Sequence, residues 1–115
     1  MAGDELSRLQ RRYQAVQNKV RELGFIAPGS LIERYTVCGT PGCRCHADPP
    51  TRHGPYIQYT RKLGGKTFTR RLDAEQANHY REWIANRRAL DQLTTEMDEL
   101  SQQAPALLHD PPPRH

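Results

Sequence analysis

The sequence has few apolar residues and no long apolar segment. Of its 115 residues, 36% are hydrophobic and 7% are aromatic, and no stretch approaches the roughly 18 apolar residues that a membrane-spanning helix needs. Residues 1–12, MAGDELSRLQRR, also lack the apolar core of a secretory signal. We therefore expect a cytoplasmic protein without a membrane segment. Its thin core should need a metal, a disulfide or a partner subunit to hold the fold together.

Cysteine is also scarce, and all three cysteines fall in one short segment. In a reducing compartment, three cysteines are better explained as thiols or metal ligands than as a disulfide framework. Cys38, Cys43, Cys45 and His53 follow the spacing C-x4-C-x-C-x7-H. Three thiolates and one imidazole form a closed tetrahedral set for structural zinc, and the intervening GTPG permits a tight turn. The pattern therefore predicts a structural Zn²⁺ site at these four residues.

Two alternatives stay open at this point. His46 is a second candidate for the fourth ligand, although its position next to Cys45 makes tetrahedral geometry harder to reach. In the second alternative no metal binds. The cysteines are then ordinary reduced thiols, and His53 is hydrogen-bonded to the backbone at the start of a strand.

Acidic residues are nearly absent from the middle of the chain. Residues 25–72 contain eight basic and two acidic side chains, whereas residues 73–103 contain three basic and seven acidic ones. The overall net charge of +4 therefore understates a strongly positive central segment. Such a localised basic region is typical of a surface that meets an anionic partner.

Two segments carry apolar residues at alternating intervals of three and four, which is the heptad pattern of a coiled coil. The first seam is Leu6, Leu9, Tyr13, Val16, Val20 and Leu23, and the second is Trp83, Asn86, Leu90, Leu93, Met97 and Leu100. We predict helices over 4–23 and 73–103 that pair antiparallel, with Leu23 near Trp83 and Leu6 near Leu100. The alternative is that one or both seams pair with a second subunit, and in either case polar Asn86 would fix register or oligomeric state.

The segment between the helices is predicted to form three strands. SLIERYTV (30–37) is rich in β-branched and aromatic residues, and PYIQYTRKL and KTFTRRL flank the turn-forming pair Gly64–Gly65. The predicted fold is thus α+β: a two-helix antiparallel coiled-coil stalk with an inserted three-stranded antiparallel β head carrying the zinc site. We expect one domain over 1–103, with the head over 25–72, and a disordered proline-rich tail over 104–115.

The motifs of the head resemble those of a family of small bacterial proteins of unknown function. The pattern is GSL, CGTPGCRC, HGPY and a GKT hairpin followed by a long helix, running from about Pro28 to Leu100. The resemblance implies that these proteins are common in actinobacteria and often encoded beside mobile elements. It implicates the following residues: Cys38, Cys43, Cys45, His53, Gly54, Pro55 and Tyr56. Ile57 departs from the pattern, because relatives often carry an aromatic there.

A hairpin turn centred on Gly64–Gly65 would separate the side chains of its strands into two faces. One face would hold Ile57, Tyr59, Phe68 and Leu72, together with Arg61 and Arg70, which we expect to pair with Glu33 or helix carboxylates. The opposite face would be polar and would meet an anionic partner. The predicted nucleic-acid contacts are Arg44, Arg52, Gln58, Lys62, Lys66 and Arg71, with Gln58 as the reader of bases.

The sequence thus predicts a zinc-stabilised nucleic-acid-binding protein, with DNA favoured, and the resemblance implies a regulatory or accessory role beside a mobile element. The alternative is a dimeric coiled-coil adaptor that docks on a transposase, recombinase or other protein without contacting nucleic acid. An enzyme is the weakest interpretation, because the head offers only Glu33 and Asp48 as carboxylates and neither lies in a recognisable motif.

Overall fold

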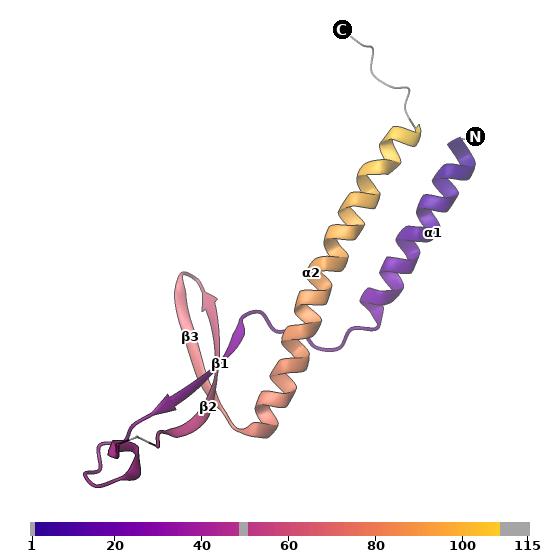
Figure 1. Ribbon diagram of the computed structural model, residues 1–115. Coiled ribbons are helices and arrows are strands. Elements are labelled where there is room, and N and C mark those ends of the chain that lie inside the picture. Colours follow the sequence, from indigo (N-terminus) through magenta and orange to yellow (C-terminus); the bar gives the residue numbers. More distant parts are fainter. Residues whose placement is uncertain (1, 49–50, 109–115) are drawn as a thin grey trace. The chain divides into compact units, whose positions relative to one another are not determined.

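The computed structural model describes residues 2–48 and 51–108. It contains helix α1 (Ala2–Arg21), strand β1 (Ser30–Thr36), the short 3₁₀ helix η1 (Arg44–His46), strands β2 (His53–Leu63) and β3 (Lys66–Leu72), and helix α2 (Ala74–Leu108) (Figure 1). The predicted α+β class and three-stranded antiparallel sheet are confirmed. The chain divides into two compact units, residues 1–25 with 86–115 and residues 26–85. Within the described ranges, no helix is apolar over a length that would cross a membrane.

The first unit is built on the seam that the heptad spacing identified in α1. From Gly3 to Leu23, all six seam residues are buried or half-buried, and every other residue is exposed. Leu9 and Val16 form a buried cluster with Leu100 of α2, against which Leu93 and Met97 pack. The two helices therefore bury these apolar faces against each other, while supercoiled knobs-into-holes packing stays a prediction.

The pairing of the two seams is offset from the predicted one. Val16 lines a shallow pocket with Leu100, and Val20 lines another with Met97, so Leu100 lies beside Val16 rather than Leu6. The extended chain after α1 explains the offset, because its Phe25 carbonyl accepts a hydrogen bond of 2.8 Å from Asn86 Nδ2. Asn86 therefore anchors a loop instead of setting register between the seams.

Helix α2 also extends beyond its predicted end at 103, to Leu108, so residues 104–108 do not belong to a disordered tail. Pro105 lies inside the helix, where its ring removes one backbone donor and normally destabilises helix. Ala104 and Leu107 compensate, because both pack against the cluster of Leu9, Val16 and Leu100. The rest of the predicted tail, 109–115, lies outside the described residues.

In the second unit, the sheet order is β1-β2-β3, and the hairpin register is the one that follows from a turn centred on Gly64–Gly65. Leu63 pairs with Lys66, Tyr59 with Arg70 and Ile57 with Leu72. Gly64 and Gly65 have φ values of 58° and 81°. Two successive positive φ angles are those of a type I′ turn, which suits the twist of a two-residue hairpin.

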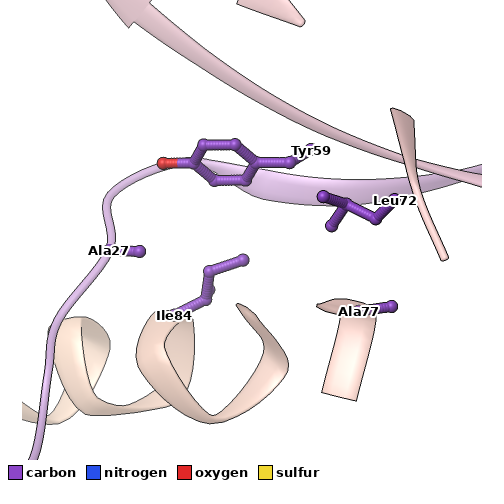
Figure 2. Close-up of a cluster of buried hydrophobic side chains, with 5 residues drawn as sticks. All are labelled: Ala27, Tyr59, Leu72, Ala77 and Ile84. Atoms are coloured by element: carbon purple, nitrogen blue, oxygen red, sulfur yellow. The ribbon is translucent and has the colours of Figure 1, made fainter. Parts of the chain in front are cut away.

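One face of this sheet packs on the first turns of α2 and forms the core of the second unit. The buried residues are Ala27, Tyr59, Leu72, Ala77 and Ile84. Figure 2 shows the Tyr59 ring lying over Ile84 of the helix, with its hydroxyl directed toward the segment that carries Ala27. That hydroxyl donates to the Pro28 carbonyl oxygen. Because Tyr59 and Leu72 face the helix, the alternate side chains of β2 and β3 face the other way.

The start of α2 is fixed by a capping box, which Asp73 and a Gln three residues later already indicate in the sequence. Asp73 Oδ1 accepts a bond of 2.8 Å from the Gln76 backbone N–H, and Gln76 Oε1 accepts one of 3.0 Å from the Asp73 N–H. This reciprocal pair satisfies backbone donors that have no partner within the helix.

We expect Asp73→Ala to lower the free energy of unfolding by about 1 kcal/mol, the usual value of a lost N-cap. Urea denaturation followed by circular dichroism measures this. Asp98→Ala, which removes an exposed carboxylate further along α2, is the matched control and should have little effect. Equal effects of the two substitutions would show that the cap contributes nothing specific.

Candidate functional site

The end of the β1–β2 ladder positions the histidine of the proposed metal site. The antiparallel register runs regularly from Ser30↔Thr60 to Arg34↔Tyr56, then shifts, and ends on Thr36↔His53. His53 is therefore the first residue of β2 and lies opposite a residue only two positions before Cys38. The strand pairing thus brings together two potential ligands that are fifteen residues apart in sequence.

The loop between these strands folds back through two tight turns. The Cys43 N–H donates to the Thr40 carbonyl at 3.4 Å, and Gly42 has a φ of 80°. Proline followed by a positive-φ glycine at the two central positions is the signature of a type II turn. The 3₁₀ helix η1 follows directly, and the Thr51 N–H closes the loop onto the Arg44 carbonyl at 2.9 Å.

These turns bring the three thiols and the imidazole into one group, which we call the Cys/His cluster. The donor atoms of Cys38, Cys43, Cys45 and His53 all lie within 4.8 Å of one another. Cys38 Sγ is 3.5 Å from Cys45 Sγ, and Cys43 Sγ is 3.4 Å from His53 Nε2. The cysteines are free thiols. Four donors converging on one point could hold a metal ion, as the sequence predicted.

His46, the alternative ligand considered from the sequence, is not among these four. It lies in η1, and its Nε2 hydrogen-bonds to the Cys38 carbonyl oxygen. Its imidazole therefore fastens one side of the loop to the other. Because Nε2 must carry its proton to donate to a carbonyl, this nitrogen is not available as a ligand in that arrangement.

The electrostatics of the Cys/His cluster differ between its thiols. Hydrogen bonding from the Thr40 backbone, followed by that from the His53 side chain, lowers the pKa of Cys38 from 9.0 to about 5. Burial instead raises the pKa of Cys45, which is almost fully enclosed. The lowered pKa favours the thiolate form of Cys38, the form in which cysteine binds metals.

The second functional feature is the sheet face opposite the core, which we call the polar sheet face. Cross-strand pairing aligns three cations on it, Arg34 of β1, Lys62 of β2 and Arg71 of β3, without any carboxylate. All three are exposed. The full set on this face is Ser30, Ile32, Arg34, Tyr56, Gln58, Thr60, Lys62, Thr67, Thr69 and Arg71.

The six residues predicted to contact nucleic acid do not all lie on this face. Gln58, Lys62 and Arg71 do, but Lys66 pairs with Leu63 and belongs to the opposite face at the hairpin tip. Arg44 and Arg52 are exposed on the loop that carries the Cys/His cluster. The structure therefore groups the predicted contacts into a sheet set and a loop set, with Lys66 apart from both.

Sequence reasoning did not assign Arg34 or Tyr56 to the polar sheet face. Arg34 was not assigned, because the pairing of β1 with β2 has no short turn from which its register could be counted. Tyr56 was implicated only by the family resemblance, yet its ring stacks against Arg71, whose Cζ lies 3.6 Å from the ring centroid. The signal for Arg34 is the alternation of side chains in IERY (32–35), which places Arg34 on the same face as Ile32. That signal identifies the face only when the register is known.

Arg61 and Arg70 lie on the core-facing side, as predicted, but their expected ion pairs are not formed. Among the described residues the ion pair is Arg87 with Asp91 in α2. Arg70 instead lies over the Phe68 ring, with its Cζ 5.4 Å from the centroid. The Arg61 Nε is buried without a hydrogen-bond partner in the described part of the chain.

Comparison with known proteins gives a family but no function. Searches of the curated proteins and of the solved structures each found no match. A family model described as a domain of unknown function, DUF6788, matches residues 6–82. The match covers most of α1, the whole sheet, the Cys/His cluster and the first turns of α2. Because this is more than half of the chain, the protein belongs to the DUF6788 family.

Proposed function

We propose that the protein is a small nucleic-acid-binding module, with DNA as the favoured ligand, whose head is stabilised by a structural zinc ion. The observation that carries the proposal is the strand register, which collects three exposed cations on one carboxylate-free face. The loop of the Cys/His cluster adds Arg44 and Arg52 at the end of the same sheet. Nothing in the described head neutralises these charges by an ion pair.

The spacing of the Cys/His cluster supports zinc as the metal. With zinc–sulfur bonds of about 2.3 Å, a tetrahedral site separates two sulfur ligands by roughly 3.8 Å, and a sulfur and a nitrogen ligand by slightly less. The corresponding distances here are 3.5 Å and 3.4 Å. Small polar domains with thin cores commonly obtain much of their folding free energy from such an ion. The four protein donors leave no open position, which favours a structural role over a catalytic one.

The chemistry of the polar sheet face suits a polyanion that carries hydrogen-bonding groups. Arginine and lysine side chains contact phosphate oxygens, and threonine hydroxyls do so as well. Gln58 lies at the centre of this face, directly between Ile32 and Arg71, where a side-chain amide has the geometry to bind a base edge. Beyond the last β1 pair at Thr60, the tip of the β2–β3 hairpin is a two-stranded ribbon, a shape that enters the major groove of B-form DNA.

A salt-dependent titration tests the nucleic-acid proposal. Fluorescence anisotropy with a labelled duplex, and with one of its single strands, would be recorded between about 50 and 200 mM salt. We expect the wild-type affinity to fall steeply with salt, because binding releases counterions from neutralised phosphates. The triple variant Arg34→Gln/Lys62→Gln/Arg71→Gln should bind more weakly and flatten the log–log slope by roughly 0.9 for each phosphate contact that it removes.

The matched control is Arg11→Gln/Arg12→Gln/Arg88→Gln, which removes the same charge from exposed positions in the first unit. It should keep nearly all of the wild-type slope. Equal losses in the two triple variants would mean that net charge alone drives binding, and the polar sheet face would not be the interface. A complete lack of binding at low salt would reject the proposal and favour the protein-interaction adaptor.

A further inference from the structure

The core-facing side of the sheet carries a pocket that plays no part in the proposed nucleic-acid interface. It measures about 340 Å³, which is within the range of small-molecule sites. Every residue that lines it belongs to the second unit. The lining residues are Ile26, Ala27, Pro28, Tyr59, Arg61, Leu63, Phe68, Arg70, Tyr80 and Trp83.

Aromatic rings form one wall of this pocket, which we call the aromatic pocket. Tyr80 of α2 lies between Tyr59 and Trp83, with ring centroids 4.6 Å and 5.1 Å away. Phe68 continues the apolar surface on β3 and is 40% exposed, and Leu63 is 58% exposed. The tilted rings hold one another in place, so the pocket has a preformed apolar floor and a partly open apolar rim.

Two guanidinium groups border the same pocket, and neither has a carboxylate partner among the described residues. One of these groups also has an unsatisfied donor. Arg61 Nε is buried and has no hydrogen-bond acceptor within residues 2–48 and 51–108. Leaving a charged donor buried and unsatisfied is costly. No acidic residue lines the pocket, so the acceptor for Arg61 must come from solvent or from a bound anion.

We propose that the aromatic pocket binds a small amphipathic anion, a compact apolar body carrying one anionic group such as a carboxylate. The apolar body would contact Tyr59, Tyr80 and Trp83, and the anionic oxygens would accept hydrogen bonds from Arg61, with Arg70 adding a second positive charge. The proposal is independent of nucleic-acid binding, because it uses the opposite face of the sheet. It concerns binding alone and involves no chemical step.

The single tryptophan of the chain, Trp83, lines the pocket and reports directly on its occupancy. The probe is adamantane-1-carboxylate, which has a compact apolar body and does not absorb where tryptophan emits. Its neutral isostere, 1-adamantanemethanol, is titrated in parallel against Trp83 emission. We expect a saturable change with the carboxylate and at least roughly tenfold weaker binding of the alcohol, since a hydrogen bond to a charged group is lost.

Arg61→Met keeps an unbranched apolar side chain but removes the charge and the donor, and it should abolish the preference for the carboxylate. Arg70→Met should weaken the preference for the carboxylate to a smaller extent. This second variant keeps the test valid if circular dichroism shows that the Arg61 variant is unfolded. Arg88→Met, on the part of α2 that belongs to the first unit, is the matched control and should bind as the wild type does. Equal affinities for acid and alcohol in the wild type would overturn the proposal, as would unchanged carboxylate affinity in both pocket variants.

Discussion

Replacing His53 with asparagine should lower the melting temperature of the protein by roughly 10 °C or more. The reason is that a structural zinc site can couple on the order of 10 kcal/mol of binding to folding, and in a small domain each kcal/mol shifts the melting temperature by several degrees. Cys43→Ser should act in the same direction by removing the sulfur that lies 3.4 Å from the His53 Nε2. Thermal denaturation by circular dichroism measures both.

The sequence supplies an unusually close control for this prediction in His46→Asn. It makes the same chemical change in the same loop, at a histidine that bonds to the Cys38 carbonyl and lies outside the Cys/His cluster. We expect it to keep the metal and to lose only the modest contribution of one hydrogen bond, about 1 kcal/mol. If His46→Asn destabilised the protein as much as His53→Asn, the assignment of His53 as a ligand would be wrong.

Replacing Tyr59 with alanine should be the most damaging substitution in the core of the second unit. Tyr59 is only 4% exposed and contacts both the helix and the loop through Pro28. Truncating a large aromatic in a core costs about 3–5 kcal/mol, which approaches the whole stability of a small domain. Tyr59→Phe keeps the ring and should cost about 1 kcal/mol, since it removes only the hydroxyl bond.

Tyr35→Ala is the matched control for the core substitution. It removes the same side chain from β1 at a position that is 55% exposed, and we expect a cost below about 1 kcal/mol. Chemical denaturation at one temperature compares the three variants. A Tyr35 variant as unstable as the Tyr59 variant would contradict the placement of the core on the α2 side of the sheet.

The features that the sequence predicted well are those set by contacts between near neighbours. The Gly64–Gly65 turn fixes the register of β2 and β3 because two residues leave no freedom in a hairpin. The capping box at Asp73 and Gln76 is likewise a local pattern. The Cys/His cluster is also local, because it spans only residues 38–53. The sequence TPGC (40–43) indicates the tight turn within it.

The features that it did not predict depend on long-range geometry. The register of β1 against β2 determines that Arg34 joins the polar sheet face, and no short turn links those strands. The offset between the helix seams depends on how the extended residues around Phe25 run along α2 and bond to Asn86. A heptad pattern repeats every seven residues, so it is equally compatible with shifted pairings.

The proposed metal binding and the proposed nucleic-acid binding are coupled, because both depend on the same sheet of the head. The polar sheet face needs a fixed sheet, whose β1–β2 end is held by strand pairing that stops at Thr36 and His53. A metal at the Cys/His cluster would close the loop just beyond this point. Removing it should therefore weaken nucleic-acid binding together with stability, although it removes no cation from the interface.

The metal content of the purified, untagged and reduced protein tests the central claim most directly. Elemental analysis combined with native mass spectrometry should find one zinc ion per chain, lost from Cys43→Ser and retained by His46→Asn. A protein that carries no stoichiometric metal after purification without chelators, and whose melting temperature is unchanged by added zinc or by chelator, would contradict the account.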